Sequence, residues 1–382
     1  MKKLLTALTI ALCFSAFLSA YEWGGVVKNV STLKTPDFSN YSYRQSDGLF
    51  FWYTTPIADT GFKFALEGLY SFSYSNAPSN GEAVNQILDI DLLKFSKVIK
   101  APTFTANINF GRFNYTDETK TIFNQNMDGA SVKFTFKKIA YKAAVGYTGL
   151  LNEKNVSILS SKSVAYGTNK QFYKLAYPYL VADLGVNFNN LFAGQNLKFE
   201  VMSFIDLGAE EKNRVYLETV MSGPIVKRFT YNASFILQTL NFEDIGLFAA
   251  LNTFYTFENN MYIKAGVEYA SGASDSLAKF ATVSSRTVTN SYTLHETTSM
   301  ILPGVQFVYV GKNYYWGIDS KFLMDYASDG FKAGGVEADF IMVYNLFSDL
   351  QLGFDIFTFT DISGASVTNS NYGAELRLTF TF

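Results

Sequence analysis

The chain has 382 residues, of which 48% are hydrophobic, 17% aromatic and only 17% charged. This composition excludes intrinsic disorder, which needs few aromatic residues and high charge, and the net charge of −2 argues against general nucleic-acid binding through a basic surface. After residue 20, no run of 18 apolar residues predicts a membrane-spanning helix. The composition leaves an aromatic-rich β protein, either water-soluble or embedded in a membrane.

The first 20 residues predict a secretory signal peptide. Two lysines near the start precede an uncharged, mostly apolar stretch that extends to Phe17, and Ala20 is small enough to precede a cleavage site. Cleavage there leaves residues 21–382 as the mature chain and removes Cys13, the only cysteine. We therefore expect an exported chain without any disulfide bond.

Alternation of apolar and polar residues dominates the mature chain and predicts antiparallel β-strands. It is clearest at the end, where apolar residues occupy every second position from Tyr372 to Phe382. We predict an all-β fold, a transmembrane antiparallel β-barrel of about 18 strands, with 16 as the alternative. The predicted strands are residues 22–34, 47–57, 61–74, 84–97, 102–114, 129–137, 140–149, 174–188, 196–207, 213–221, 228–239, 245–257, 260–270, 300–310, 314–326, 334–346, 350–360 and 371–382.

The connections between these strands alternate in length. The long ones fall on one side and are residues 35–46, 75–83, 115–128, 150–173, 271–299 and 361–370. The short ones fall on the other side and are residues 58–60, 138–139, 258–259, 311–313 and 347–349. Short turns on one rim and long loops on the other are typical of outer-membrane barrels, although 239–245 is short for a loop and 189–195 long for a turn. A soluble β protein would not need the nearly charge-free outer register of these strands.

The polar register of each strand is expected to face an aqueous lumen, which a barrel of 16–18 strands is wide enough to hold. Acids outnumber bases there, which predicts a weak preference for cations. On the last four strands we expect Lys321 to lie beside Asp339, either in a solvated wall of ion pairs or in a constriction. The candidate lumen and constriction residues are Arg112, Asp117, Asp128, Lys133, Asp319, Lys321, Asp325, Glu337, Asp339, Asp355, Glu375 and Arg377.

A constriction is expected to come from a loop that folds inward, because the first strand begins at about residue 22 and leaves no room for an N-terminal plug. Of the long loops 115–128, 150–173 and 271–299, the first is favoured. Arg112 at its base has Asp117 and Asp128 as candidate partners that would pin the loop through a charge-assisted hydrogen bond. Strict alternation points Arg112 outward; a bulge at Gly111 would turn it inward, and otherwise it is a rim residue.

Two sequence patterns resemble known outer-membrane proteins. The last strand is similar to the C-terminal recognition signal of bacterial outer-membrane barrels, and its apolar face is Tyr372, Leu376, Leu378, Phe380 and Phe382. Gly111-Arg112-Phe113, followed by Asp117 and by Asp128-Gly129, resembles large monomeric porin-like channels of 16–18 strands, of the substrate-specific and polysaccharide-export types. The resemblance implies a bacterial outer-membrane channel whose partners are membrane lipid, the barrel-assembly machinery and small hydrophilic solutes. Phosphate and alginate types have an inward arginine ladder, which this chain, with six arginines, does not show.

The sequence argues against an enzyme and against a bound cofactor or metal. His295 is the only histidine, so histidine-dependent catalytic triads and two-histidine metal sites are excluded. No phosphate-binding loop has the required spacing, and nucleic acid is not an expected partner. The prediction is a porin-like channel for passive diffusion of small hydrophilic solutes. The alternative is a surface-exposed scaffold that acts as an adhesin or antigen through residues 150–173 and 271–299.

Overall fold

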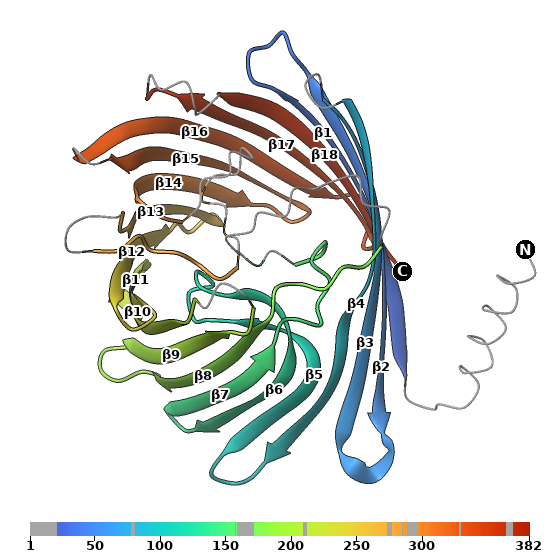
Figure 1. Ribbon diagram of the computed structural model, residues 1–382, viewed down its shortest axis with the longest axis vertical. Helices are drawn as coiled ribbons and strands as arrows, with labels where there is room; N and C mark the ends of the chain where they lie inside the picture. The colour runs from blue at the N-terminus through green and yellow to red at the C-terminus, as the bar shows by residue number, and fades with distance from the viewer. Residues whose placement is uncertain are drawn as a thin grey trace, which may run out of the picture.

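In the computed structural model, the described part of the chain is a closed antiparallel β-barrel of 18 strands (Figure 1). The structure describes residues 21–77, 81–156, 158, 172–208, 212–272, 277–284, 286, 288, 297–327, 330–363 and 370–382. The strands are β1 (Glu22–Thr35), β2 (Ser42–Ile57), β3 (Phe62–Ala77), β4 (Gly81–Lys100), β5 (Thr105–Thr116), β6 (Asn124–Phe136), β7 (Ile139–Tyr147), β8 (Tyr179–Phe188), β9 (Asn196–Asp206), β10 (Arg214–Val226), β11 (Phe229–Leu240), β12 (Asp244–Thr256), β13 (Met261–Ala270), β14 (Met300–Val310), β15 (Tyr314–Ala327), β16 (Gly330–Asn345), β17 (Leu350–Asp361) and β18 (Asn371–Thr381). One short 3-10 helix, η1 (Ala58–Thr60), joins β2 to β3.

The barrel closes because β1 pairs with both β2 and β18. Closure gives every strand two neighbours, so most of the strand backbone is hydrogen-bonded within the sheet, which is the condition for crossing a lipid bilayer with strands. Side chains alternate between two faces: Leu376, Leu378 and Phe380 are exposed on the outside, whereas Glu375 is buried inside. No helix in the described part of the chain is long and apolar enough to cross a membrane.

The alternation of long and short connections is largely as predicted, but two predicted loops are wrong. Residues 35–46 and 75–83 were expected to be long loops, yet β1 ends at Thr35, β2 begins at Ser42, and β3 and β4 continue to Ala77 and from Gly81. The physical reason lies in the outer face of these strands. Gln45 and Asp47 point outward in β2, so the apolar alternation stops while backbone pairing continues.

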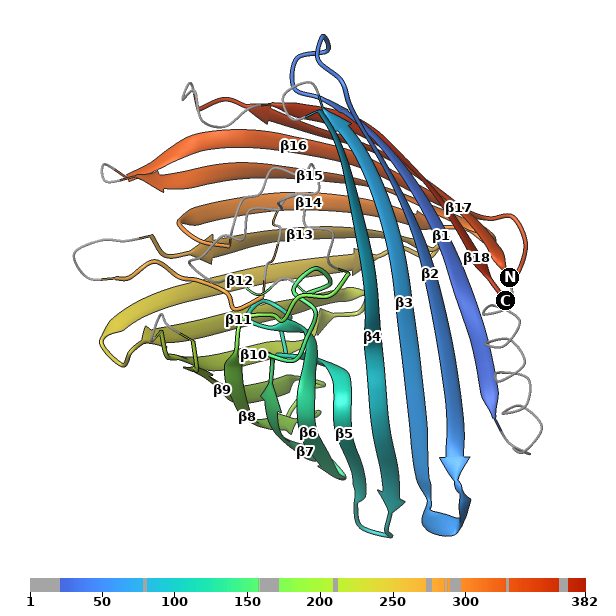
Figure 2. The ribbon, with the colours of Figure 1, turned by 45° about the vertical axis from the view of Figure 1, so that its right-hand side comes forward.

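The sheet separates between β4 and β5 over residues 81–92 of β4 and residues 113–116 of β5. β4 pairs with β5 only from Leu93 to Lys100, and β5–β7 then curve away from the straight β4 (Figure 2). Two glycines permit this bend. Gly111 has φ +108°, and a Cβ there would lie 2.1 Å from the Leu93 carbonyl oxygen; a Cβ at Gly129 would lie 2.1 Å from that of Val145. Only glycine tolerates such close backbone approach.

The buried apolar core lies inside the barrel, on one side of it. Its strand residues come from β5–β15 and β17: Phe113, Met127, Ala144, Tyr179, Val181, Met202, Phe204, Tyr216, Ile236, Phe248, Ala270, Met300, Leu302, Leu323 and Phe359. Among the described residues, no buried core member comes from β1–β4, β16 or β18. The remaining core members belong to two loops, which enter the barrel and pack against its inner face.

Candidate functional site in the lumen

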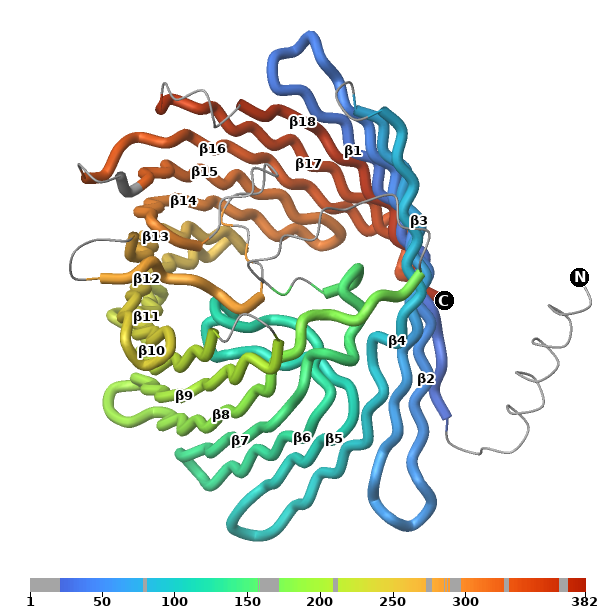
Figure 3. The backbone as a smooth tube through the Cα atoms, viewed as in Figure 1, coloured from blue at the N-terminus to red at the C-terminus, as the bar shows by residue number. Residues whose placement is uncertain are grey.

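Two extracellular loops fold into the lumen, residues 117–123 between β5 and β6 and residues 277–284 between β13 and β14 (Figure 3). Ile122, Phe123 and Phe280 are 0% exposed and pack against the apolar inner face of the curved strands. The loops also contact each other: the Val283 N–H donates to the Ile122 carbonyl at 2.9 Å, and the Asn124 N–H donates to Ser284 Oγ at 2.8 Å. The described parts of the two loops therefore form one body inside the barrel.

Asp117 holds the first loop in shape. Its carboxylate accepts backbone N–H bonds from Thr119, Thr121, Ile122 and Phe123 at 2.7–3.1 Å, and its side chain is buried. A carboxylate that collects several backbone donors satisfies groups that would otherwise be buried without partners. Of the two predicted alternatives for the partner of Arg112, Asp117 is therefore wrong, because it binds its own loop, and Asp128 is the partner.

Glu118 anchors this loop to the barrel wall. Its carboxylate pairs with Lys198 at 2.6 Å and with Lys142 at 3.4 Å, and it accepts a bond from Asn187 Nδ2 at 3.2 Å. Its backbone N–H donates to Glu200 Oε2 at 2.9 Å. Burial raises the pKa of Glu118, but the hydrogen bond from Lys198 and the charge of Lys142 outweigh it and lower the pKa to about 2.

Lys142 is the centre of the wall side of this anchor. Besides Glu118, it pairs with Glu200 at 2.6 Å and with Asp183 at 3.7 Å, and Asp183 also accepts a hydrogen bond from the Tyr115 hydroxyl. Because β5, β7, β8 and β9 each contribute a residue, the anchor forms only in the closed sheet. The sequence signal for it was the inward register of Lys142, Asp183 and Glu200; the contribution of Glu118 from the loop had no signal.

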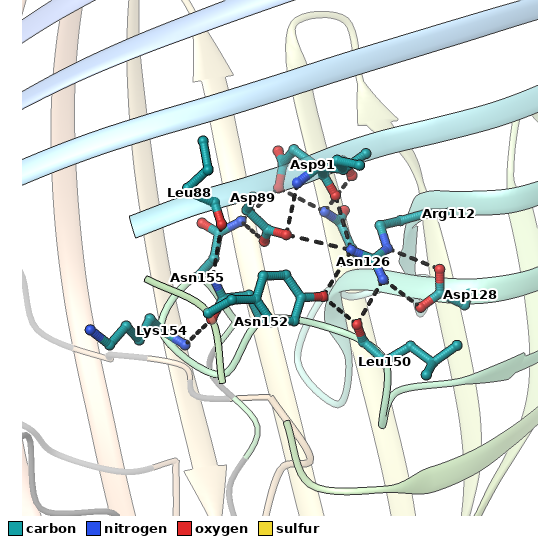
Figure 4. Close-up of polar contacts among 12 residues, drawn as sticks. Leu88, Asp89, Asp91, Arg112, Asn126, Asp128, Leu150, Asn152, Lys154 and Asn155 are labelled. Atoms are coloured by element: carbon teal, nitrogen blue, oxygen red, sulfur yellow. Dashed lines mark hydrogen bonds and ion pairs between the residues drawn. The ribbon is translucent and has the colours of Figure 1, made fainter. Parts of the chain in front are cut away.

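Arg112 lies in the gap between β4 and β5 and bridges four segments (Figure 4). Its guanidinium makes a bidentate pair with Asp128, with Nε–Oδ1 at 2.9 Å and Nη2–Oδ2 at 3.0 Å. It also donates to the carbonyl oxygens of Leu150 at 2.8 Å and Ile90 at 3.1 Å, and lies 3.5 Å from Asp89. The side chain is 11% exposed, so these contacts satisfy a largely buried cation.

Loop residues 150–155 and 172–174 fill this gap in place of β5. Asn155 Nδ2 donates to Asp89 and Asp91 at 2.8 Å each, and Asn152 Nδ2 donates to the Phe172 carbonyl at 3.2 Å. We call the whole set the seam network. Its residues are Asp89, Asp91, Arg112, Asn126, Asp128, Leu150, Asn152, Asn155 and Tyr173.

Two predicted lumen residues in the seam network need correction. Arg112 and Asp128 face each other on the register that alternates with the buried inner-face residues Phe113 and Met127, so they lie on the outer register of β5 and β6. Strict alternation was therefore the right reading, and no bulge turns Arg112 inward. Loop residues Leu150 and Tyr173 contact Arg112, and Arg112 in turn pairs with Asp128.

The wall formed by β15–β18 carries most of the other predicted residues on its inner face. Lys321 pairs with Asp319 at 3.2 Å and with Glu337 at 3.1 Å. The register places Lys321 opposite Glu337, and Asp319 opposite Asp339. The prediction that Lys321 lies beside Asp339 is therefore wrong, because the neighbour of Lys321 is the preceding inward acid, Glu337. Leu323 and Met324 mark a bulge that the sequence did not reveal.

The remaining predicted residues also lie on the inner face. Arg377 pairs with Asp355 at 2.6 Å and lies 3.7 Å from Glu375, which accepts a hydrogen bond from Thr32 at 3.0 Å. Asp325 pairs in register with the inward-facing Met300. Lys133 pairs in register with Lys142, with its side chain exposed to the lumen.

Four inward bases were missed by the sequence analysis. The register places Lys28 and Lys34 of β1, Arg44 of β2 and Lys94 of β4 on the inner face. The alternation from Trp23 through Val27 was the signal that would have placed the bases of β1. With these four bases, the numbers of acidic and basic side chains on the inner face are nearly equal.

The last strand places its predicted apolar face outward, at the closure of the barrel. Phe382 exchanges two backbone hydrogen bonds with Gly25 of β1, each at 3.0 Å. Its ring lies over Gly25, where a Cβ would be 2.4 Å from the ring. Leu376, Leu378 and Phe380 lie on the same outer face, so the end of the chain both seals the barrel and faces lipid.

The described residues contain no group of three or more His, Cys, Asp or Glu side chains that could hold a metal ion. His295 lies outside the described residues, so its surroundings carry no argument.

No protein-family model and no curated protein matches the sequence, whereas solved structures match the fold over nearly the whole chain. Pseudomonas aeruginosa OpdK with vanillate has a TM-score of 0.66 at 11% identity, covering 96% of this chain and 99% of that one. P. aeruginosa OccK8 (OprE) has a TM-score of 0.65 at 11% identity, with the same coverage. P. aeruginosa OpdQ has a TM-score of 0.63 at 11% identity, covering 95% and 98%. The chain therefore has the fold of these outer-membrane porins, and the prediction of a bacterial outer-membrane barrel of about 18 strands is confirmed at the level of the fold.

Proposed function

We propose that the chain is an outer-membrane channel through which small hydrophilic solutes diffuse passively, with a weak preference for cations and no catalytic role. The observation that carries this proposal is the set of charged side chains that remain exposed inside a closed barrel. Lys28, Arg44 and Lys63 are exposed on the inner face of β1–β3. Exposed charges of this kind need water around them, so a water-filled passage along these strands supports conduction.

The two loops that pack together inside the barrel support a narrow channel, because they occupy part of the lumen. Residues 117–123 and 277–284 pack on the inner face of the curved strands, which leaves the straight strands as the wall of the passage. A pore reduced in this way passes small solutes and excludes large ones. OpdK was solved with vanillate, a small aromatic carboxylate; we carry over only the size class of solute.

The preference for cations is proposed to be weak because two walls of opposite sign face the passage. Acidic residues predominate on the inner face of β15–β18, where Asp319 and Asp355 are partly exposed and Glu337 and Asp339 are buried, whereas β1 and β2 supply exposed bases. Rings or walls of charge bias permeation by their sign. Opposed walls cancel most of that bias.

Purified protein in a planar bilayer tests the channel directly. We expect discrete current steps, and a reversal potential in a salt gradient that is displaced slightly towards cations at low salt. The displacement should fade near 1 M salt, where the screening length is about 3 Å. A folded barrel that gives no current step would contradict the proposal and favour the alternative of surface recognition through the long loops.

The triple variant Glu337→Gln, Asp339→Asn, Asp355→Asn tests the charge assignment. It removes three acids and leaves Lys321 with Asp319 and Arg377 with Glu375 as the remaining carboxylate neighbours, so the reversal potential should move towards anions. The matched control is Glu258→Gln, which removes an exposed acid paired with Arg228 at the periplasmic rim and should leave the potential unchanged. An unchanged reversal potential in the folded triple variant would show that this wall does not line the conducting path.

A further inference from the structure

A hydrogen-bonded patch of polar side chains lies on the outer face of β1 and β2. Asn29 Nδ2 donates to Asp47 Oδ1 at 2.6 Å, and Ser31 Oγ donates to Gln45 Oε1 at 3.0 Å. The Tyr43 hydroxyl donates to the same Gln45 oxygen. We call these five residues, Asn29, Ser31, Tyr43, Gln45 and Asp47, the outer polar patch.

The outer polar patch shares its face with exposed apolar residues. Val27 and Leu33 on β1 and Leu49 on β2 belong to the same alternating register and are 43%, 47% and 45% exposed. The intervening register points inward, as Thr32 shows through its hydrogen bond to the inner residue Glu375. The patch therefore faces away from the lumen.

The outer polar patch lies within the apolar band and not above it. Along β1 it has Val27 on the periplasmic side and Leu33 on the extracellular side. Across the sheet, Asn29 pairs with Leu378 of β18, and Asp47 pairs with Phe72 of β3. Lipid chains offer no hydrogen bonds, and an ionisable residue at membrane depth points to a functional contact with a partner.

We propose that the outer polar patch is the contact surface for a second copy of this chain. The patch carries both hydrogen-bond donors and acceptors, so two copies of it can bind each other. Asn29 Nδ2 carries a second N–H, and Asp47 has a second carboxylate oxygen. Across a two-fold axis along the membrane normal, Asn29 of one copy donates to Asp47 of the other, and the reverse pair forms by symmetry.

The shape of this side of the barrel suits such a contact. β18, β1, β2 and β3 run side by side as nearly straight strands (Figure 2), in contrast to the curved strands across the barrel. Outward residues next to the patch include the small Ala374, which pairs with Leu33. Two such faces meet over several strands, with the polar pairs at the centre and Leu49, Leu376 and Leu378 around them.

Cysteine cross-linking in intact outer membranes tests the contact, because the expected mature chain has no cysteine of its own. We place Ser31→Cys in the patch and use Ala182→Cys as the matched control, an exposed small residue on the outer face of β8 across the barrel. Oxidation should give a disulfide-linked species of twice the mass with Ser31→Cys, at least tenfold more than with Ala182→Cys.

A second variant separates the contact from folding. Asn29→Leu with Asp47→Leu makes the patch apolar, which suits lipid, so the barrel should keep its heat-modifiable gel mobility. In the Ser31→Cys background it should reduce the cross-linked dimer at least tenfold, and it should halve the mass of the purified protein in mild detergent. The inference is overturned if Ser31→Cys cross-links no more than Ala182→Cys, if it captures only a different protein, or if the leucine pair leaves the dimer intact.

Discussion

The two sides of the barrel are built from the same kind of alternating strand but differ in strand length, in curvature and in what their inner face carries. On one side, β5–β14 are short and curved, and their inner face is apolar and covered by two loops. On the other, β1–β4 are longer and nearly straight (Figure 2), and their inner face carries exposed charges such as Lys28, Arg44 and Lys63. The difference shows that strand alternation sets which face is inside, whereas loops and glycines decide how much of the inside stays open.

Removal of Phe382 should have the largest effect, because it extends the pairing of β18 with β1 that closes the barrel. Phe382 makes two backbone hydrogen bonds to Gly25, and the apolar face of the last strand resembles an assembly signal. Deletion of Phe382, or its change to Asp, should reduce the folded barrel in the outer membrane severalfold, as measured by heat-modifiable mobility and membrane yield. Gly68→Ala, on β3 where a Cβ would meet no atom within 4 Å, serves as a remote control. Normal yield without Phe382 would contradict the assembly role.

Substitution of Gly111 should have the next largest effect, because the curved side begins there. In Gly111→Val the side chain would meet the Leu93 carbonyl, and the residue would have to keep φ +108°. Backbone strain of this kind costs about 1–3 kcal/mol, and overpacking adds about 1–3 kcal/mol. Urea titration in lipid vesicles should show that loss.

Gly68→Val is the matched control for this bend. Gly68 lies on β3, on the straight side, and a Cβ there would meet no atom within 4 Å. We expect its unfolding midpoint to stay close to that of the unchanged protein. Equal losses in both variants would mean that the bend at Gly111 is not what distinguishes the two sides.

Asp117→Ala should loosen the loop body without unfolding the barrel. The change removes the acceptor for four backbone N–H groups, three of them on buried residues, and each buried donor left unpaired costs about 1–3 kcal/mol. With residues 117–123 released, the current step should rise and become noisier. Asp37→Ala is the control, because Asp37 folds the exposed turn between β1 and β2 in the same way, through bonds from Ser39 and Asn40. Identical recordings from both variants would remove residues 117–123 from the constriction.

The sequence predicted the barrel because lipid imposes period two on every strand, as the run from Tyr372 to Phe382 shows. It missed the upper part of β2, because the outward Gln45 and Asp47 interrupt that period for a reason other than lipid. It also predicted Asp128 as one of two partners for Arg112. The two residues lie directly opposite each other on β5 and β6, so their contact depends only on the register of neighbouring strands. The loop that covers Arg112, and the meeting of Glu118 with Lys142 and Lys198, depend on long-range closure and left no local pattern.

The pH response of the Glu118 anchor should be the smallest effect, and it concerns only the curved side. The pKa of Glu118 is lowered to about 2, so its carboxylate is charged in the folded protein wherever it is charged in the unfolded chain. A lowered pKa contributes stability above the ordinary value, about 4.3, and this stability is lost only as the pH falls towards 2. Noise from the loop should therefore stay constant from pH 7 to pH 4.5. Glu118→Gln breaks the pairs with Lys142 and Lys198 and should raise that noise already at pH 7. The difference between the two proteins isolates this carboxyl from Glu200 and Asp183 beside it, and a difference that vanished between pH 7 and 4.5 would show that Glu118 loses its charge there and does not hold the loop as an ion pair.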